Sequence, residues 1–134
     1  MASIISIEGI GPVYTEKLAA AGIKTTEKLL EAGASRKGRG ALAKETGIDE
    51  KRILRWVNMA DLFRIKGVGE EFSDLLEAAG VDTVKELRNR NAENLHKKIQ
   101  EVNEEKNLVR QTPGLSKIQD FIAQAKEMEP VVTY

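Results

Sequence analysis

Two similar stretches, residues 7–23 and 65–81, constrain the fold of this chain more than any other feature. They read IEGIGPVYTEKLAAAGI and IKGVGEEFSDLLEAAGV. In each, two glycines flank one aliphatic residue, a segment with helical spacing follows, and another glycine ends it. Glycine adopts positive φ angles without steric cost, so a Gly-x-Gly pattern indicates a very tight turn that opens a helix. The sequence therefore predicts the same turn-and-helix unit twice.

The similarity between the two halves extends beyond the glycine turns. Matching residues recur at an offset of 58 in the turn regions, and at an offset of 65 between residues 53–60 and 118–125. The second half has gained seven residues, most simply in the loop at residues 103–112. A unit of this size cannot easily bury its apolar faces alone, so we expect repeats at residues 1–64 and 65–134 to share one core.

The paired stretches resemble the helix-hairpin-helix motif, and the whole chain is similar to an uncharacterised tandem helix-hairpin-helix family, domain of unknown function 4332. The stretch RILRWVNMADLFRIKGVGEEFSDLLEAAGVDTVKELRNRNAENLH and the ending VVTY carry the closer resemblance. It implies a compact helical hairpin, whose Gly-x-Gly turn often holds a nucleic-acid phosphate. It implies almost nothing about an activity.

Helical spacing and capping residues predict an all-α fold of about eight or nine helices. The predicted helices cover residues 13–21, 26–32, 41–46, 50–64, 70–79, 84–89, 92–105 and 116–128. Thr25 or Thr26, Thr83 and Asn91 are predicted to cap helix starts, and Gly47 to end a helix. Residues 34–40 are consistent with a loop or a helix start, and residues 2–7 with one helical turn or an extended segment. Both chain ends are apolar, so we expect them to pack on the body or on each other, or to form a self-association surface.

Composition limits the possible functions. The 134 residues include 21 basic and 21 acidic side chains, and this zero net charge argues against strong non-specific binding of polyanions. The charge is uneven, however: residues 1–64 hold 11 basic and 8 acidic residues, net +3, and residues 65–134 hold 10 and 13, net −3. With no cysteine, disulfides and thiolate chemistry are excluded. No signal peptide or membrane-spanning run is recognisable, so we expect a cytoplasmic protein without a membrane partner.

No catalytic pattern is present in the sequence. There is no nucleophile–base pair, P-loop, dinucleotide fingerprint or metal-ligand spacing, so we expect no enzyme activity, no cofactor and no metal site. His96, the only histidine, is expected on the surface of a polar helix. Trp56, on an apolar helix face, is expected in the core rather than as a base-stacking platform.

Candidate contacts with a nucleic-acid backbone gather in the first repeat. They are Gly9, Gly11, Val13, Tyr14, Lys17, Arg36, Lys37 and Arg39. The amides of the first three lie near a helix N-terminus, where a phosphate oxygen is favoured. Arg36, Lys37 and Arg39 contribute only if their segment folds to the same side as the turn. At the second turn, Glu70 and Glu71 would repel a phosphate, so any such site is predicted in the first turn alone.

Two functions remain open after these considerations. One is an accessory module that holds DNA or RNA backbone phosphates without reading sequence. The other is a protein-interaction scaffold or self-associating structural protein, in which the hairpins serve packing only. The basic first repeat favours the former and the balanced net charge favours the latter. Either function is compatible with a monomer or a weak homodimer.

Overall fold

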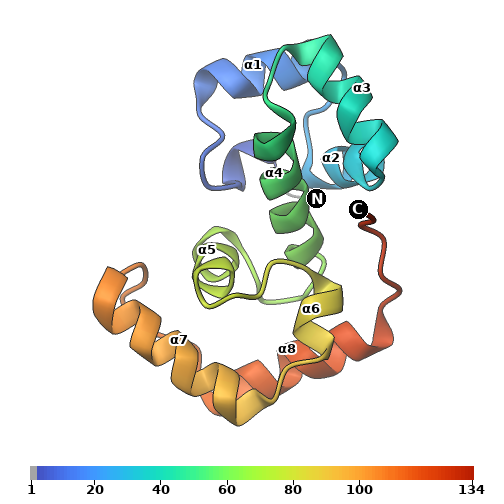
Figure 1. The fold of residues 1–134 in the computed structure, drawn as a ribbon. Coiled ribbons are helices and arrows are strands. Elements are labelled where there is room, and N and C mark those ends of the chain that lie inside the picture. The colour runs from blue at the N-terminus through green and yellow to red at the C-terminus, as the bar shows by residue number, and fades with distance from the viewer. Residues whose placement is uncertain (1–2) are drawn as a thin grey trace. The chain divides into compact units, whose positions relative to one another are not determined.

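The computed structural model describes residues 3–134, and it is all-α across this range (Figure 1). The part of the predicted lead-in that falls on Ala2 lies outside the described residues. The structure contains one short 3-10 helix and eight α-helices in the described residues, with no strand beyond an isolated bridge between Ser3 and Thr25. The elements are η1 (Ile4–Ser6), α1 (Pro12–Ala20), α2 (Thr26–Gly33), α3 (Arg36–Thr46), α4 (Glu50–Leu62), α5 (Glu70–Ala78), α6 (Val84–Arg88), α7 (Ala92–Lys106) and α8 (Leu115–Glu127).

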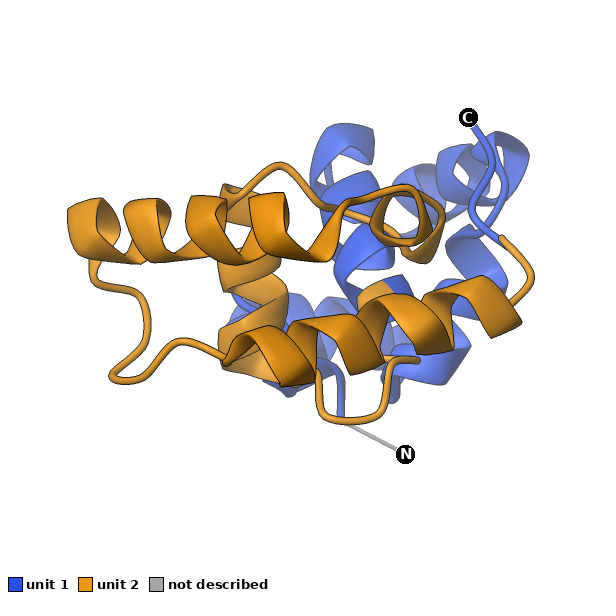
Figure 2. Cartoon of the chain, turned by 90° about the horizontal axis from the view of Figure 1, so that it is seen from below, with its two compact units in different colours: residues 1–61, 131–134 blue, residues 62–130 orange. Residues whose placement is uncertain are grey.

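The chain divides into two compact units, coloured separately in Figure 2. Unit 1 consists of residues 1–61 together with residues 131–134, and unit 2 consists of residues 62–130. Unit 1 therefore holds η1, α1 to α3 and nearly all of α4, and unit 2 holds α5 to α8. In the described range, no helix is long and apolar enough to cross a membrane.

Polar side chains cap the starts of α2 and α3 in unit 1. The Thr25 hydroxyl accepts a hydrogen bond from the amide of Lys28 at 3.1 Å, which starts α2. The Ser35 hydroxyl accepts from the amide of Gly38 at 3.0 Å, so residues 36–40 form the start of α3 rather than a loop. The helix α3 then ends at Gly47 in the left-handed conformation.

An apolar stripe on α4 fills the core of unit 1. Ile53, Trp56 and Val57 are fully buried, which confirms the predicted core position of the only tryptophan. Other buried side chains of this unit are Ile4, Ile7, Ile10, Leu18, Ile23, Leu29, Leu42 and Ile48. Burial of a large aliphatic or aromatic side chain contributes roughly 1.5–3 kcal/mol, so this stripe stabilises the unit.

In unit 2, α6 and α7 pack on α8, and α5 packs on α7 (Figure 2). Its core is Leu62, Ile65, Val68, Leu75, Leu76, Ala79, Val81, Val84, Leu87, Leu95, Ile99, Val102, Val109, Ile118, Phe121, Ile122 and Ala125.

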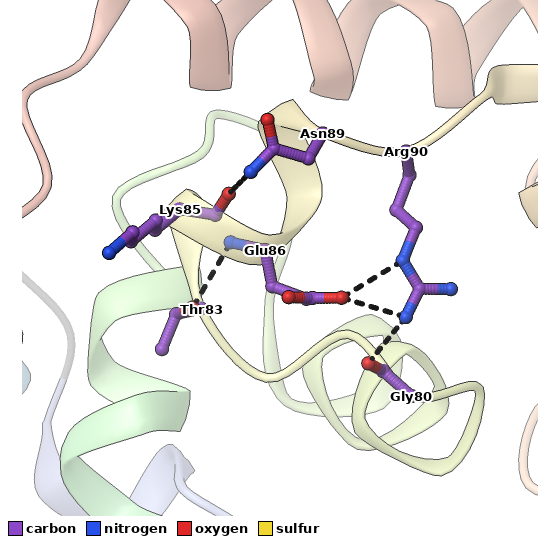
Figure 3. A network of polar contacts seen from close by, with 6 residues as sticks. All are labelled: Gly80, Thr83, Lys85, Glu86, Asn89 and Arg90. Carbon is purple, nitrogen blue, oxygen red and sulfur yellow. Dashed lines mark hydrogen bonds and ion pairs between the residues drawn. The ribbon is translucent and has the colours of Figure 1, made fainter.

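The short helix α6 is held by a polar network (Figure 3). Arg90 donates to the Gly80 carbonyl at 2.9 Å and pairs with Glu86 at 2.9 Å, while Thr83 caps the helix. This network anchors the end of α6 to the turn after α5.

Residues 131–134 return to unit 1 as an extended tail. The amide of Thr133 donates to the Ala34 carbonyl at 2.8 Å, and the Tyr134 hydroxyl donates to Asn58 Oδ1 at 3.2 Å. Val132 is buried, as is Ile4 near the other end. The expectation that the apolar ends pack on the body is thus confirmed for these two residues, whereas Ile5, Val131 and Tyr134 remain exposed.

Candidate nucleic-acid interface

The first glycine turn, residues 9–11, leads directly into α1. Gly9 has φ 95°, a conformation that L side chains rarely adopt, and Ile10 is buried beneath it. Gly11 is the N-cap of α1 and receives the first hydrogen bond of the helix, from the amide of Thr15 at 2.9 Å. The amide of Val13 therefore precedes the helical ladder, and its side chain is 64% exposed. The positive end of α1 thus faces solvent with no acidic residue in its first turn.

The helix α4 lies against this turn. A Cβ atom placed on Gly9 would lie 3.4 Å from Nε1 of Trp56 and 3.6 Å from Nη1 of Arg55. The indole fills the space below the turn, and the guanidinium of Arg55 lies beside it. A residue larger than glycine would therefore be disfavoured at position 9 both by the backbone and by these neighbours.

A cleft of about 330 Å³, here called the Gly9 cleft, opens between the turn and α4. It is lined by Gly9, Asp49, Lys51, Arg52, Arg55 and Trp56. Three cations and one carboxylate thus line this cleft. The side chains that α4 contributes were not in the predicted set of contacts. The sequence places these side chains on the same helix as the apolar Trp56. Only the packing of α4 shows that this part of the helix meets the glycine turn.

Tyr14 holds one of these cations in place. Its hydroxyl accepts a hydrogen bond from Nη1 of Arg52 at 2.6 Å, and the guanidinium lies 5.1 Å from the centre of the Tyr14 ring. The ring itself packs edge-on against Trp56, with 5.0 Å between ring centres. Because an oriented guanidinium loses less entropy when it binds an anion, this contact preorganises Arg52.

The predicted basic residues of the first repeat fall into two groups. Lys17, Arg36 and Lys37 are exposed. Arg39 is only 3% exposed, and it donates to the carbonyls of Gly33, Ala34 and Thr133 at 2.9, 3.0 and 2.6 Å. Its guanidinium is thus occupied inside unit 1. Arg39 is removed from the set of candidate contacts, because its charge serves to hold the tail.

The second glycine turn has the same backbone and different charges. Gly67 has φ 99°, and its missing Cβ would lie 3.1 Å from the ring of Phe121. The helix α5 begins after Gly69 with two exposed carboxylates, Glu70 and Glu71, in its first turn. The nearby cleft of about 580 Å³ is lined by Phe72, Gln111, Thr112, Pro113, Gly114, Ser116, Lys117 and Asp120. One cation and one carboxylate line this cleft, so it lacks the positive excess of the Gly9 cleft.

The chain matches the family described as a domain of unknown function (DUF4332) over residues 8–128. It belongs to that family. No curated protein and no solved structure matches the chain. The DUF4332 region contains both glycine turns and all eight α-helices. Within the described residues, no group of three or more histidine, aspartate or glutamate side chains is arranged to hold a metal ion.

Unit 1 has a second cleft, here called the Tyr134 cleft. Its volume is about 440 Å³, and its walls are Arg36, Arg39, Asp49, Glu50, Lys51, Leu54 and Tyr134. Asp49 and Lys51 line both clefts, so the two are neighbours across the start of α4. Of the predicted basic residues, Arg36 is therefore brought near the Gly9 cleft, whereas Lys17 and Lys37 line neither cleft.

Proposed function

We propose that this chain is a non-enzymatic tandem helix-hairpin-helix module. We further propose that its first hairpin binds the backbone of DNA or RNA weakly and without reading sequence. The repeat is supported by equivalent hydrogen bonds in both halves. The amide of Ile23 donates to Leu18 O at 2.9 Å, and the amide of Val81 donates to Leu76 O at 2.8 Å. Each bond closes the helix that follows a glycine turn.

The observation that carries the binding proposal is the cationic face of α4 against the Gly9 turn. A phosphate at the N-terminus of α1 would meet amide N–H groups and the positive end of the helix. Arg52 and Arg55 lie in the same cleft and add charged donors, which suit phosphate because a guanidinium presents two parallel N–H groups. At the second turn the first two helical residues are Glu70 and Glu71, which repel a phosphate at the equivalent place.

The proposed contact set differs from the one predicted from the sequence. It keeps the amides of the turn and the exposed Arg36. It also keeps Lys17 and Lys37, which are exposed but line neither cleft. It adds Arg52 and Arg55, and it gives Tyr14 the role of positioning Arg52 rather than of binding directly. Few phosphate contacts mean modest affinity, with the logarithm of the binding constant falling by roughly 0.9 per contact for each tenfold rise in salt on duplex DNA.

A pair of charge reversals tests this proposal. Binding of fluorescein-labelled 12-nucleotide single strands and 12-base-pair duplexes is measured by anisotropy at low and moderate salt. The variant Arg52→Glu with Arg55→Glu should lose salt-sensitive binding, because a repulsive pair replaces the two guanidinium groups. Circular dichroism melting verifies that the variant remains folded.

The matched control is Lys97→Glu with Lys98→Glu, which changes the net charge by the same amount at exposed positions of α7. It should bind like the wild type. An equal loss of affinity in the two variants would mean that only the net charge matters, and it would reject the first-turn site. If the wild type has no salt-sensitive binding even at low salt, the nucleic-acid proposal fails and the scaffold alternative stands.

A further inference from the structure

The Tyr134 cleft differs in chemistry from the Gly9 cleft beside it. Its walls carry two carboxylates, Asp49 and Glu50, together with the exposed cations Arg36 and Lys51 and the buried Arg39. The aliphatic side chain of Leu54 and the ring of Tyr134 complete the lining. Because the guanidinium of Arg39 already binds three backbone carbonyls, the two exposed cations are matched by two carboxylates, and a phosphate gains little here. A flat, neutral group with polar edges suits this lining better.

The ring of Tyr134 is both exposed and held in place. It is 67% exposed, yet its hydroxyl donates to the buried Asn58 at 3.2 Å. The guanidinium of Arg39 lies 5.7 Å from the ring centre and also binds the preceding carbonyl, of Thr133. An aromatic ring fixed in this way loses little conformational entropy when a second ring stacks on it. Stacking of nucleobases on aromatic side chains is the usual mode by which proteins hold unpaired nucleotides.

The two neighbouring clefts match two adjacent parts of a nucleic-acid strand, a phosphate and a base. The Gly9 cleft is cationic and suits a backbone phosphate, and the Tyr134 cleft shares two wall residues with it, Asp49 and Lys51. We propose that the Tyr134 cleft takes the base of an unpaired nucleotide next to the phosphate held at the Gly9 cleft. This inference rests on the proposed function and deepens it. The ligand is then a single strand of DNA or RNA, or a single-stranded segment, because base pairing and stacking hide the base faces in a duplex.

The carboxylates of the cleft fit this assignment. Asp49 and Glu50 can accept hydrogen bonds from the exocyclic amino groups of a base, as acidic side chains do from cytosine N4. They would repel a second phosphate, so the strand's backbone is expected to follow the cationic side of the clefts. The cleft has no arrangement of donors and acceptors unique to one base, so sequence preference is expected to be weak.

The test compares an intact single strand with the same strand carrying one central abasic site. Anisotropy titrations use labelled 12-nucleotide DNA and RNA, and a 12-base-pair DNA duplex, against wild type, Tyr134→Ala and Tyr134→Phe. Wild type should bind the intact strand about tenfold more tightly than the abasic strand, in line with stacking of one base. In Tyr134→Ala that difference should vanish, whereas Tyr134→Phe, which keeps the ring, should retain it.

Each outcome separates this inference from the proposed function. A preference of the wild type for the intact strand that Tyr134→Ala abolishes, together with loss of duplex binding in the Arg52 and Arg55 reversal, supports both. Equal binding of intact and abasic strands by the wild type, with the same loss in the reversal, overturns the base site and leaves the phosphate site standing. The absence of salt-sensitive binding to every probe overturns both. A circular dichroism melt of Tyr134→Ala within a few degrees of wild type establishes that the comparison concerns folded protein.

Discussion

Nη2 of Arg39 donates a hydrogen bond to the carbonyl of Thr133 at 2.6 Å, joining α3 to a tail 94 residues later in the chain. Nη1 of the same guanidinium also binds the carbonyls of Gly33 and Ala34, at the end of α2. The last carbonyls of a helix have no partner within the helix, and a cation there interacts favourably with the helix dipole. One buried arginine thus caps α2 and holds the tail.

Replacing Arg39 by alanine should destabilise unit 1 by about 2–4 kcal/mol. The carbonyls of Gly33, Ala34 and Thr133 would each lose a charged donor, and hydrogen bonds to charged groups are among the stronger ones. Urea denaturation followed by circular dichroism measures the loss. The control is Lys37→Ala, an exposed neighbour in the same helix, which should change stability by less than about 0.5 kcal/mol. Similar losses at the two positions would contradict the structural role of Arg39.

Two glycines of unit 1 should respond oppositely to alanine. A Cβ on Gly33 would lie 2.5 Å from Cγ2 of Val57, so Gly33→Ala should cost about 1–3 kcal/mol through overpacking. A Cβ on Gly40, inside α3, would meet only Glu50 Oε1 at 3.9 Å. Gly40→Ala should therefore stabilise the protein by about 0.5–1 kcal/mol, because alanine has the higher helix propensity. Thermal melts of both variants test the pair, and the same sign in both would refute the close packing of α2 on α4.

Trp56 is fully buried, but its indole N–H has no hydrogen-bond partner among the described residues. Trp56→Phe removes this unsatisfied donor along with some volume, so it should cost only about 1 kcal/mol. Trp56→Ala should cost about 3–5 kcal/mol because it leaves a cavity. Chemical denaturation read by far-ultraviolet circular dichroism compares them, since Trp56 is the only tryptophan. If phenylalanine costs as much as alanine, the N–H makes a contact of greater value than the structure indicates.

Reversing the acidic residues at the second turn should create nucleic-acid binding there. The variant Glu70→Lys, Glu71→Lys and Asp120→Lys places cations at the N-terminus of α5 and in the cleft beside it. Affinity for labelled duplex DNA and its salt dependence should both rise, because each new phosphate contact releases counterions. The control carries Glu101→Lys, Glu104→Lys and Glu105→Lys on exposed positions of α7. Equal gains in the two variants would attribute the effect to net charge alone.

The local features of this fold could be predicted from the sequence. Thr25 and Asn91 cap helices as expected, and Gly47 ends one. Trp56 lies in the core because its helix has apolar residues at helical spacing. These features depend on φ angles and hydrogen bonds within four residues of each position. The all-α class and the helix positions follow from such rules without knowledge of the tertiary structure.

The distribution of charge around the first turn depended on packing. Arg39 has the same sequence signal as the exposed Arg36, but the tail and the end of α2 close over it. Arg52 and Arg55 lie more than 40 positions from Gly9 in the sequence, and only the packing of α4 brings them to the turn. Sequence spacing determines which face of a helix a side chain occupies. Side-chain packing over the whole unit determines which element that face contacts. This packing buries the guanidinium of Arg39 and brings Arg52 and Arg55 to the glycine turn.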